Sequence, residues 1–387
     1  MAIAAVGLTN PLAQVSAAAN MPSGTITQGI DEQTEIKTIV DRYFKTKYEG
    51  QRIGIQQDFG RFATNSPRAN QFIKTERDKR EVELLQASLF GLNYLKYEYA
   101  LNFPNIKVDT TTKEALVTVS EGHDVVFASS PAVVSKSGDI EHTITLRHDG
   151  VQWLIEKDDY EDDMRRMVTG GGGKDAAIAR MRAFKQRGGP QPTGPIPTPV
   201  PPGPGRQDTF GQRAVLSPNG VLSGVQHPYD RYAAWDYARN WWYRRNTAVY
   251  NDYGSNPGDD CTNFVSQCIH NGGAPMDNTG SWQWYSLNKS DSVAWVNVVA
   301  IWNYLVNNTW TGPYGVAAWV DSVDVGDLLQ LDFGGGWGHC PIITTKGGQT
   351  FDAIFVAAHS ENHFDYPISY YTTAVGWRFC KIWGYYD

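Results

Sequence analysis

The chain of 387 residues is long enough for two ordinary domains, each with its own hydrophobic core. Its composition, 41% hydrophobic and 19% charged, is typical of a soluble globular protein, and no apolar run reaches the length of a membrane span. The formal net charge of −7 lies in residues 228–387, where eight Lys and Arg face fifteen Asp and Glu. This acidic composition excludes a nucleic-acid partner, because phosphates require clustered Lys and Arg.

Residues 1–30 are expected to be a signal-like or disordered N-terminus. An apolar stretch opens the chain, and the small residues Ala17, Ala18 and Ala19 follow it, as at a signal cleavage site. The first basic residue is Lys37, so the basic start of a full secretory signal is lacking. We therefore expect a secreted or cell-envelope protein whose signal is incomplete in this sequence.

Residues 31–165 are predicted to form a small α+β domain. Apolar residues at helical spacing predict two helices, and a later change to period two predicts antiparallel strands joined by a tight turn at His148–Gly150. The helices are expected at residues 31–50 and 77–98, and the strands at 115–120, 124–128, 142–146 and 152–155. This order is faintly similar to NTF2-like or cystatin-like domains, a fold-level analogy that implies no chemistry.

Residues 166–227 are predicted to be a linker rich in Gly and Pro. Four glycines occupy residues 170–173, and a Pro-rich stretch follows between Pro190 and Pro204. Residues 176–186 between them favour a short basic helix. Such a spacer is typical of a chain whose two units work at different places, and it leaves residues 228–387 as a second domain.

The second domain holds twelve of the thirteen Trp residues and all four Cys residues. Most of these Trp rings are expected in the hydrophobic core, and an alternative is that some line a groove for a sugar or a peptide. None of the cysteines forms a Cys-x-x-Cys pair, so the spacing does not support a structural zinc knuckle.

Cys261 is the predicted nucleophile. A break rich in Gly and Pro precedes it, and the apolar period of residues 261–269 predicts a helix that begins at the cysteine. Free N–H groups and the helix dipole at such a start favour a thiolate and can hold an oxyanion. Asp260 is a candidate cap for this helix start. The rival interpretation of Cys261 is a buried, inert thiol.

Two histidines are candidates for the base that such a cysteine needs. His339 follows the Gly-rich turn 334–338 and opens one predicted strand, and His359 ends the next one. In an antiparallel hairpin the start of one strand lies near the end of the next, so we expect the two histidines to be neighbours. One would act as base and the other would orient it. Asn362 and His363 are alternatives for the orienting group.

The string Gly258-Asp-Asp-Cys-Thr-Asn-Phe-Val-Ser-Gln267, with Gly326–Asp327 and the later histidines, resembles the putative amidase domain family of papain-like cell-wall peptidases and amidases. The resemblance covers roughly residues 228–387. It implies a papain-like α+β domain in which a helix bearing Cys261 packs on an antiparallel sheet bearing His339. It also implies Cys261 as nucleophile, His339 as base and His359 as orienting residue. The Cys340-Pro341 pair departs from the family pattern.

The expected function is hydrolysis of an amide bond through a thioester, with a peptide or peptidoglycan-type substrate. No metal or organic cofactor is required for this chemistry. Three alternatives stay open: an acyltransferase with the same Cys and His, a non-catalytic cell-wall binding protein, and a metal site. The metal site would use Cys261, His339, His359 and His363.

Overall fold

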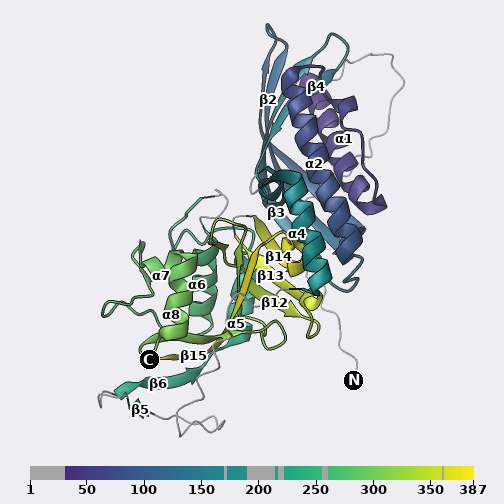
Figure 1. The fold of residues 1–387 in the computed structure, drawn as a ribbon. Helices are drawn as coiled ribbons and strands as arrows, with labels where there is room; N and C mark the ends of the chain where they lie inside the picture. The colour runs from purple at the N-terminus through teal and green to yellow at the C-terminus, as the bar shows by residue number, and fades with distance from the viewer. Residues whose placement is uncertain (1–30, 170–171, 190–213, 217–221, 255–259, 360) are drawn as a thin grey trace, which may run out of the picture.

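The computed structural model describes residues 31–169, 172–189, 214–216, 222–254, 260–359 and 361–387 (Figure 1). The signal-like residues 1–30 and the Pro-rich stretch of the expected linker lie outside these ranges. None of the helices in the described ranges is both long and apolar enough to cross a membrane.

The N-terminal unit consists of two long helices, α1 (Glu32–Ile53) and α2 (Pro67–Phe90), beside a four-stranded antiparallel sheet (Figure 1). Its strands are β1 (Tyr94–Asp109), β2 (Glu114–Phe127), β3 (Ser135–His148) and β4 (Trp153–Asp159). Asp31 and Ser66 cap the two helices by accepting hydrogen bonds from free backbone N–H groups. The order of helices before strands and the turn after His148 are as predicted, whereas strand β1 was not expected.

Several bounds of the predicted N-terminal elements are wrong, and the second helix begins at Pro67 instead of residue 77. The second helix ends at Phe90 instead of residue 98, because Gly91 adopts a left-handed conformation (φ 71°) and strand β1 begins at Tyr94. The strands expected at 115–120 and 124–128 are one continuous strand, β2. A register irregularity between Glu121 and His123 takes the place of the expected turn, so the polar residues there continue the ladder.

The C-terminal unit places helices on one face of a sheet (Figure 1). These helices are α5 (Arg231–Trp241), α6 (Cys261–Asn271), α7 (Val293–Val296) and α8 (Val298–Asn307). The strands are β5 (Ala214–Leu216), β6 (Leu222–Pro228), β9 (Gly312–Ala318), β10 (Leu328–Asp332), β11 (Trp337–His339), β12 (Ile342–Lys346), β13 (Ile354–Ala358), β14 (Asn362–Pro367) and β15 (Gly376–Tyr386). A small hairpin joins β7 (Ser286–Leu287) and β8 (Ser290–Asp291).

The two units share one antiparallel sheet. Its hydrogen-bonded order is β1-β2-β3-β14-β13-β12-β10-β15-β6-β5, with β4, β11 and β9 attached at β3, β10 and β15. The junction is the pairing of β14 with β3, where Asn362 lies opposite Gly138 and Phe364 opposite Lys136. The α+β class with a large antiparallel sheet is therefore confirmed, and the two units expected at the ends of a spacer are joined by strand pairing.

Part of the expected linker is helical and packed. Helices α3 (Asp163–Thr169) and α4 (Gly173–Arg187) cover the face of β10, β12 and β13 that is opposite to α6. Phe184 of α4 contacts the rings of Phe351 and Trp377, with centroids 5.1 and 5.4 Å away. The basic helix expected at 176–186 is the central part of α4.

Gly272, directly after α6, provides a test of this packing. A Cβ atom there would lie 2.1 Å from a ring carbon of Tyr229, whose hydroxyl donates to the carbonyl of Gly326. We expect Gly272→Ala to lower the free energy of unfolding by about 1–3 kcal/mol, as overpacking of a core does. Gly335→Ala is the control, because a Cβ there meets no atom within 4 Å. Equal denaturation midpoints for the two variants would contradict this packing.

Candidate active site

Cys261 is the first residue of α6, and its side chain is 1% exposed. The backbone N–H of Cys340 acts on the Cys261 thiol in the direction that lowers its pKa, so the sulfur lies close to the end of β11. Helix α6 is buried from Cys261 to Ile269. The predicted helix start is therefore present, and it faces the strand segment that carries His339.

Polar residues of the cysteine motif attach α6 to its neighbours. Asn263 accepts a hydrogen bond from the Trp295 indole at 2.8 Å, and Ser266 accepts one from the Trp284 indole at 3.1 Å. The Gln267 side chain accepts one from the Tyr237 hydroxyl at 2.7 Å. These bonds connect α6 to α5, to α7 and to the segment before β7.

Asp260 does not cap α6 through its side chain, contrary to the expectation. Its fully buried carboxylate instead pairs with Arg245 at 3.0 Å and with His359 Nδ1 at 2.5 Å, and it accepts a bond from Asn263 at 2.8 Å. The physical reason is that a buried negative charge requires opposite charge and donors, which these three side chains provide.

His339 ends β11 and is 5% exposed. Its ring lies 5.6 Å from the ring of Tyr371, and its buried Nε2 has no hydrogen-bond partner among the described residues. Arg166 of α3, Glu361 and His363 are the charged or titratable groups that act on it. An unpaired buried nitrogen in a polar surrounding is an atom that a reaction step could use.

His359 lies elsewhere, against the start of α6. Besides the bond from Nδ1 to Asp260, its Nε2 lies 2.8 Å from the carbonyl oxygen of Trp241, and its ring stacks on Phe264 at 3.9 Å. The His359 ring therefore lies against Phe264 of α6, whereas the His339 ring lies beside that of Tyr371. Both nitrogens of His359 thus have partners other than His339.

Glu361 and His363 lie on the His339 side. One oxygen of Glu361 is 2.8 Å from His363 Nε2, and the other accepts a hydrogen bond of 2.8 Å from the backbone N–H of Asp163 in α3. Asn362 has a different partner, because its side-chain oxygen accepts a hydrogen bond of 2.8 Å from Arg245. Sequence reasoning missed Glu361, although its two-residue spacing from His363 on one strand face was a usable signal.

Burial favours the uncharged forms of both Cys261 and His339. Burial raises the pKa of the Cys261 thiol to about 11, and hydrogen bonds from Thr262 and Cys340 oppose the shift only in part. Burial lowers the pKa of His339 to about 3, and the Arg166 charge acts in the same direction. At neutral pH the closed site therefore contains a thiol and an uncharged imidazole.

The side chains considered for a metal site do not converge. His359 bonds to Asp260 and Trp241, whereas His363 bonds to Glu361 and lies 3.3 Å from the Tyr371 hydroxyl. Within the described ranges, no group of three or more His, Cys, Asp or Glu residues is arranged to hold a metal ion.

Two curated proteins from Bacillus subtilis (strain 168) are similar to this region. YhbB, an uncharacterized protein, is 34% identical over 144 residues, which are 34% of this chain and 44% of YhbB. YjcM, also uncharacterized, is 28% identical over 159 residues, which are 38% of this chain and 35% of YjcM. The chain thus matches less than half the length of each of these relatives.

A solved structure, the Kfla4162 protein from Kribbella flavida, aligns with 35% of this chain and 99% of its own length, at 9% identity and a TM-score of 0.24. A comparison with family models matches a longer part of the chain. The matched region contains the cysteine motif with α6, His339 at the end of β11, and His359 after β13. Residues 228–384 match the model of the putative amidase domain family.

Proposed function

We propose that the C-terminal unit is a cysteine-dependent hydrolase of amide bonds with a papain-like active site. The observation that carries the proposal is that the Cys261 sulfur, at the start of α6, lies close enough to the backbone N–H of Cys340, the residue after His339, for that N–H to act on its pKa. A reactive cysteine at a helix start beside a histidine is the arrangement expected of this chemistry. The amidase domain match over residues 228–384 supports the same assignment.

In the proposed reaction His339 removes the thiol proton while the Cys261 sulfur attacks the carbonyl carbon of the amide. Backbone N–H groups at the start of α6 stabilise the negative oxygen, because the first N–H groups of a helix have no acceptor inside it. The protonated His339 then gives its proton to the leaving amine, and a thioester remains. Water, deprotonated by His339, attacks the thioester and releases the acid and the thiol.

The site must open before a substrate can reach the sulfur, since Cys261 and His339 are both buried. We propose that α3 is the element that moves. Arg166 of α3 acts on His339 and on Tyr371, and the backbone N–H of Asp163 at the start of α3 bonds to Glu361. Displacement of this short helix would remove a positive charge from His339 and admit water, which favours proton uptake by the imidazole.

The substrate that fits this proposal is a peptide of the cell envelope, for example a peptidoglycan stem or cross-bridge, met by a secreted form of the protein. The N-terminal unit, with its proposed NTF2-like or cystatin-like fold, would position the catalytic unit. Transfer of the acyl group to an amine is the second candidate reaction, since it needs the same cysteine and histidine. An amine-dependent product would distinguish transfer from hydrolysis.

Removal of either reactive group is expected to abolish activity. Cys261→Ser and His339→Ala should each lower release of new amines from purified peptidoglycan at least ~1,000-fold, because each removes a reactant. Cys268→Ala is the matched control: this cysteine is buried two turns further along α6. Retained hydrolysis by folded Cys261→Ser would contradict the proposed nucleophile.

The proposed movement of α3 can be tested by alkylation, without a substrate. Met164→Ala removes a fully buried side chain of α3 and should make iodoacetamide label Cys261 several-fold faster, through more frequent opening. Met181→Ala, an equally buried methionine in α4, is the control and should change labelling much less. If both variants react at the wild-type rate, α3 does not gate the site.

Acid should destabilise the protein through His339. Its pKa is about 3 when folded and about 6.5 when unfolded, so the unfolded chain binds a proton that the folded chain does not bind between these values. The resulting stability is present above pH 6.5 and is lost as pH falls towards 3, at up to about 1.4 kcal/mol per pH unit. Urea titrations from pH 6.5 to 4 should give a shallower loss for His339→Gln. Equal slopes would show that His339 does not contribute.

A further inference from the structure

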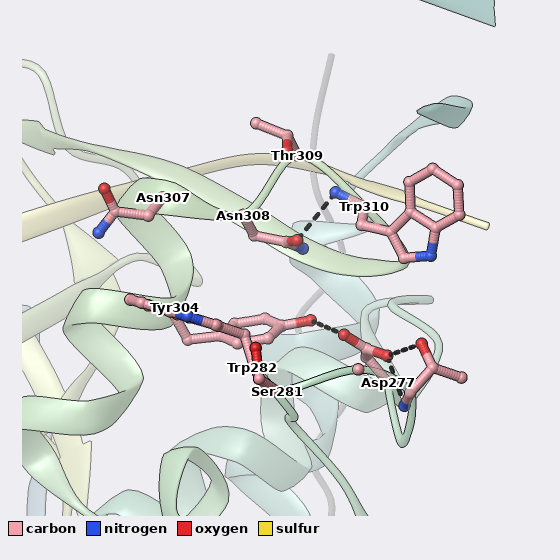
Figure 2. Close-up of a pocket in the computed structure, with 10 residues that line it drawn as sticks. Asp277, Ser281, Trp282, Tyr304, Asn307, Asn308, Thr309 and Trp310 are labelled. Carbon is pink, nitrogen blue, oxygen red and sulfur yellow. Dashed lines mark hydrogen bonds between the residues drawn. The ribbon is translucent and has the colours of Figure 1, made fainter. Parts of the chain in front are cut away.

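A second hollow lies in the C-terminal unit, away from Cys261. It has a volume of about 620 Å³ and is bounded by the loop of residues 277–282 after α6, by the end of α8, and by residues 308–310 after α8 (Figure 2). Cys261 is at the opposite end of α6, and eleven helical residues span ~16 Å. The hollow is therefore separate from the proposed active site, and its size is that of a small-ligand site.

Two tryptophans give this pocket exposed aromatic surface. Trp282 is 56% exposed and Trp310 is 43% exposed, whereas Trp284 and Trp295 nearby are fully buried in the core. The two exposed rings come from the two different loops (Figure 2). Keeping large apolar rings in water is unfavourable, and two at the same hollow indicate a surface that binds something.

The side-chain amide of Asn308 holds the loop after α8 in place. The Asn308 side chain accepts a hydrogen bond of 2.9 Å from the backbone N–H of Trp310 (Figure 2). It also donates one of 2.9 Å to the carbonyl of Pro313. These bonds tie Trp310 to the start of β9. A binding loop that is ordered before the ligand arrives lowers the entropy cost of binding.

The pocket floor has a spare acceptor. Asp277 is 3% exposed, and its Oδ1 accepts two hydrogen bonds from Thr279. The Tyr304 hydroxyl lies 3.2 Å from Asp277 Oδ2 and 2.8 Å from the carbonyl of Thr311 (Figure 2). A hydroxyl has one proton, so when it bonds to Thr311 the Oδ2 atom has room for a donor from a ligand.

The charge of the pocket lining restricts which kinds of ligand can bind. Asp277 is the sole charged side chain among its lining residues, all of which are described, and no Lys or Arg lines it. Phosphates and other anions are therefore disfavoured. A ligand must instead offer an apolar face to the indoles and hydroxyl donors to the carboxylate. A sugar ring has both, because its C–H groups form a flat apolar face and its hydroxyls lie at the rim.

We propose that this pocket is a saccharide-binding site for a neutral glycan, with Trp282 and Trp310 as stacking platforms and Asp277 as the acceptor for a sugar hydroxyl. The inference does not depend on the chemistry at Cys261. Binding here would hold the C-terminal unit on a surface that carries glycans, wherever the amide bond lies.

The test uses the full chain and two uncharged probes, chitotetraose and cellotetraose, with calorimetry as the readout. We expect saturable binding of at least one probe at millimolar concentration or below, weakened about tenfold or more by Trp282→Ala and by Trp310→Ala. Asp277→Asn should weaken it several-fold, because an amide leaves one acceptor oxygen where the carboxylate has two. The matched control is Trp383→Ala, which replaces a tryptophan that is 44% exposed on β15 and outside the pocket.

Three results would overturn the proposal. One is the absence of saturable binding of both oligosaccharides. Another is binding that the Trp383 variant weakens as much as the pocket variants do. The third is tighter, Trp282-dependent binding of an uncharged tetrapeptide, which would assign the pocket to a peptide. Unchanged iodoacetamide labelling of Cys261 in each variant would verify that the fold is intact.

Discussion

The buried carboxylate of Asp260 is the constraint on which the C-terminal unit depends. A charge with no exposed surface is tolerated only when it is paired, and the partners of Asp260 come from other parts of the chain. Arg245 lies after α5, and His359 follows β13 and also bonds to the last residue of α5. These contacts position the start of α6 relative to the sheet, and so they position Cys261 relative to His339.

The same packing keeps Cys261 and His339 away from solvent. Low solvent access favours the uncharged forms of Cys261 and His339, whose pKa values are about 11 and about 3. At neutral pH both groups are therefore uncharged in this structure, and the proposed reaction begins from a thiol and a neutral imidazole. Helix α3 comes from the segment between the two units and packs on the shared sheet, in the same hydrophobic cluster as residues of α2.

The two ends of helix α6 lie in different environments: Cys261 is buried at its start, and the open pocket lies beyond its end. Its first turn holds a buried thiol beside a strand, where a low dielectric strengthens electrostatic effects. The loop after its last turn contributes to an open pocket with exposed indoles and a carboxylate. The tryptophans fall into two groups. Trp284 and Trp295 are buried in the core and donate hydrogen bonds to α6. Trp282 and Trp310 are exposed and line the pocket.

Local sequence signals determined much of this protein. The Gly- and Pro-containing break and the apolar period predicted that a helix starts at Cys261, and the segments on either side of the Gly-rich turn 334–338 predicted antiparallel strands around His339. Only the tertiary structure decided that His359 bonds to Asp260, that Glu361 lies near His339, and that Arg166 of α3 acts on His339. It also decided the pairing of β3 with β14, whose partners Gly138 and Asn362 are far apart in the chain. The reason is physical: caps, turns and periodicity act over a few residues, whereas strand partners and buried charge pairs are selected by the packing of the whole chain.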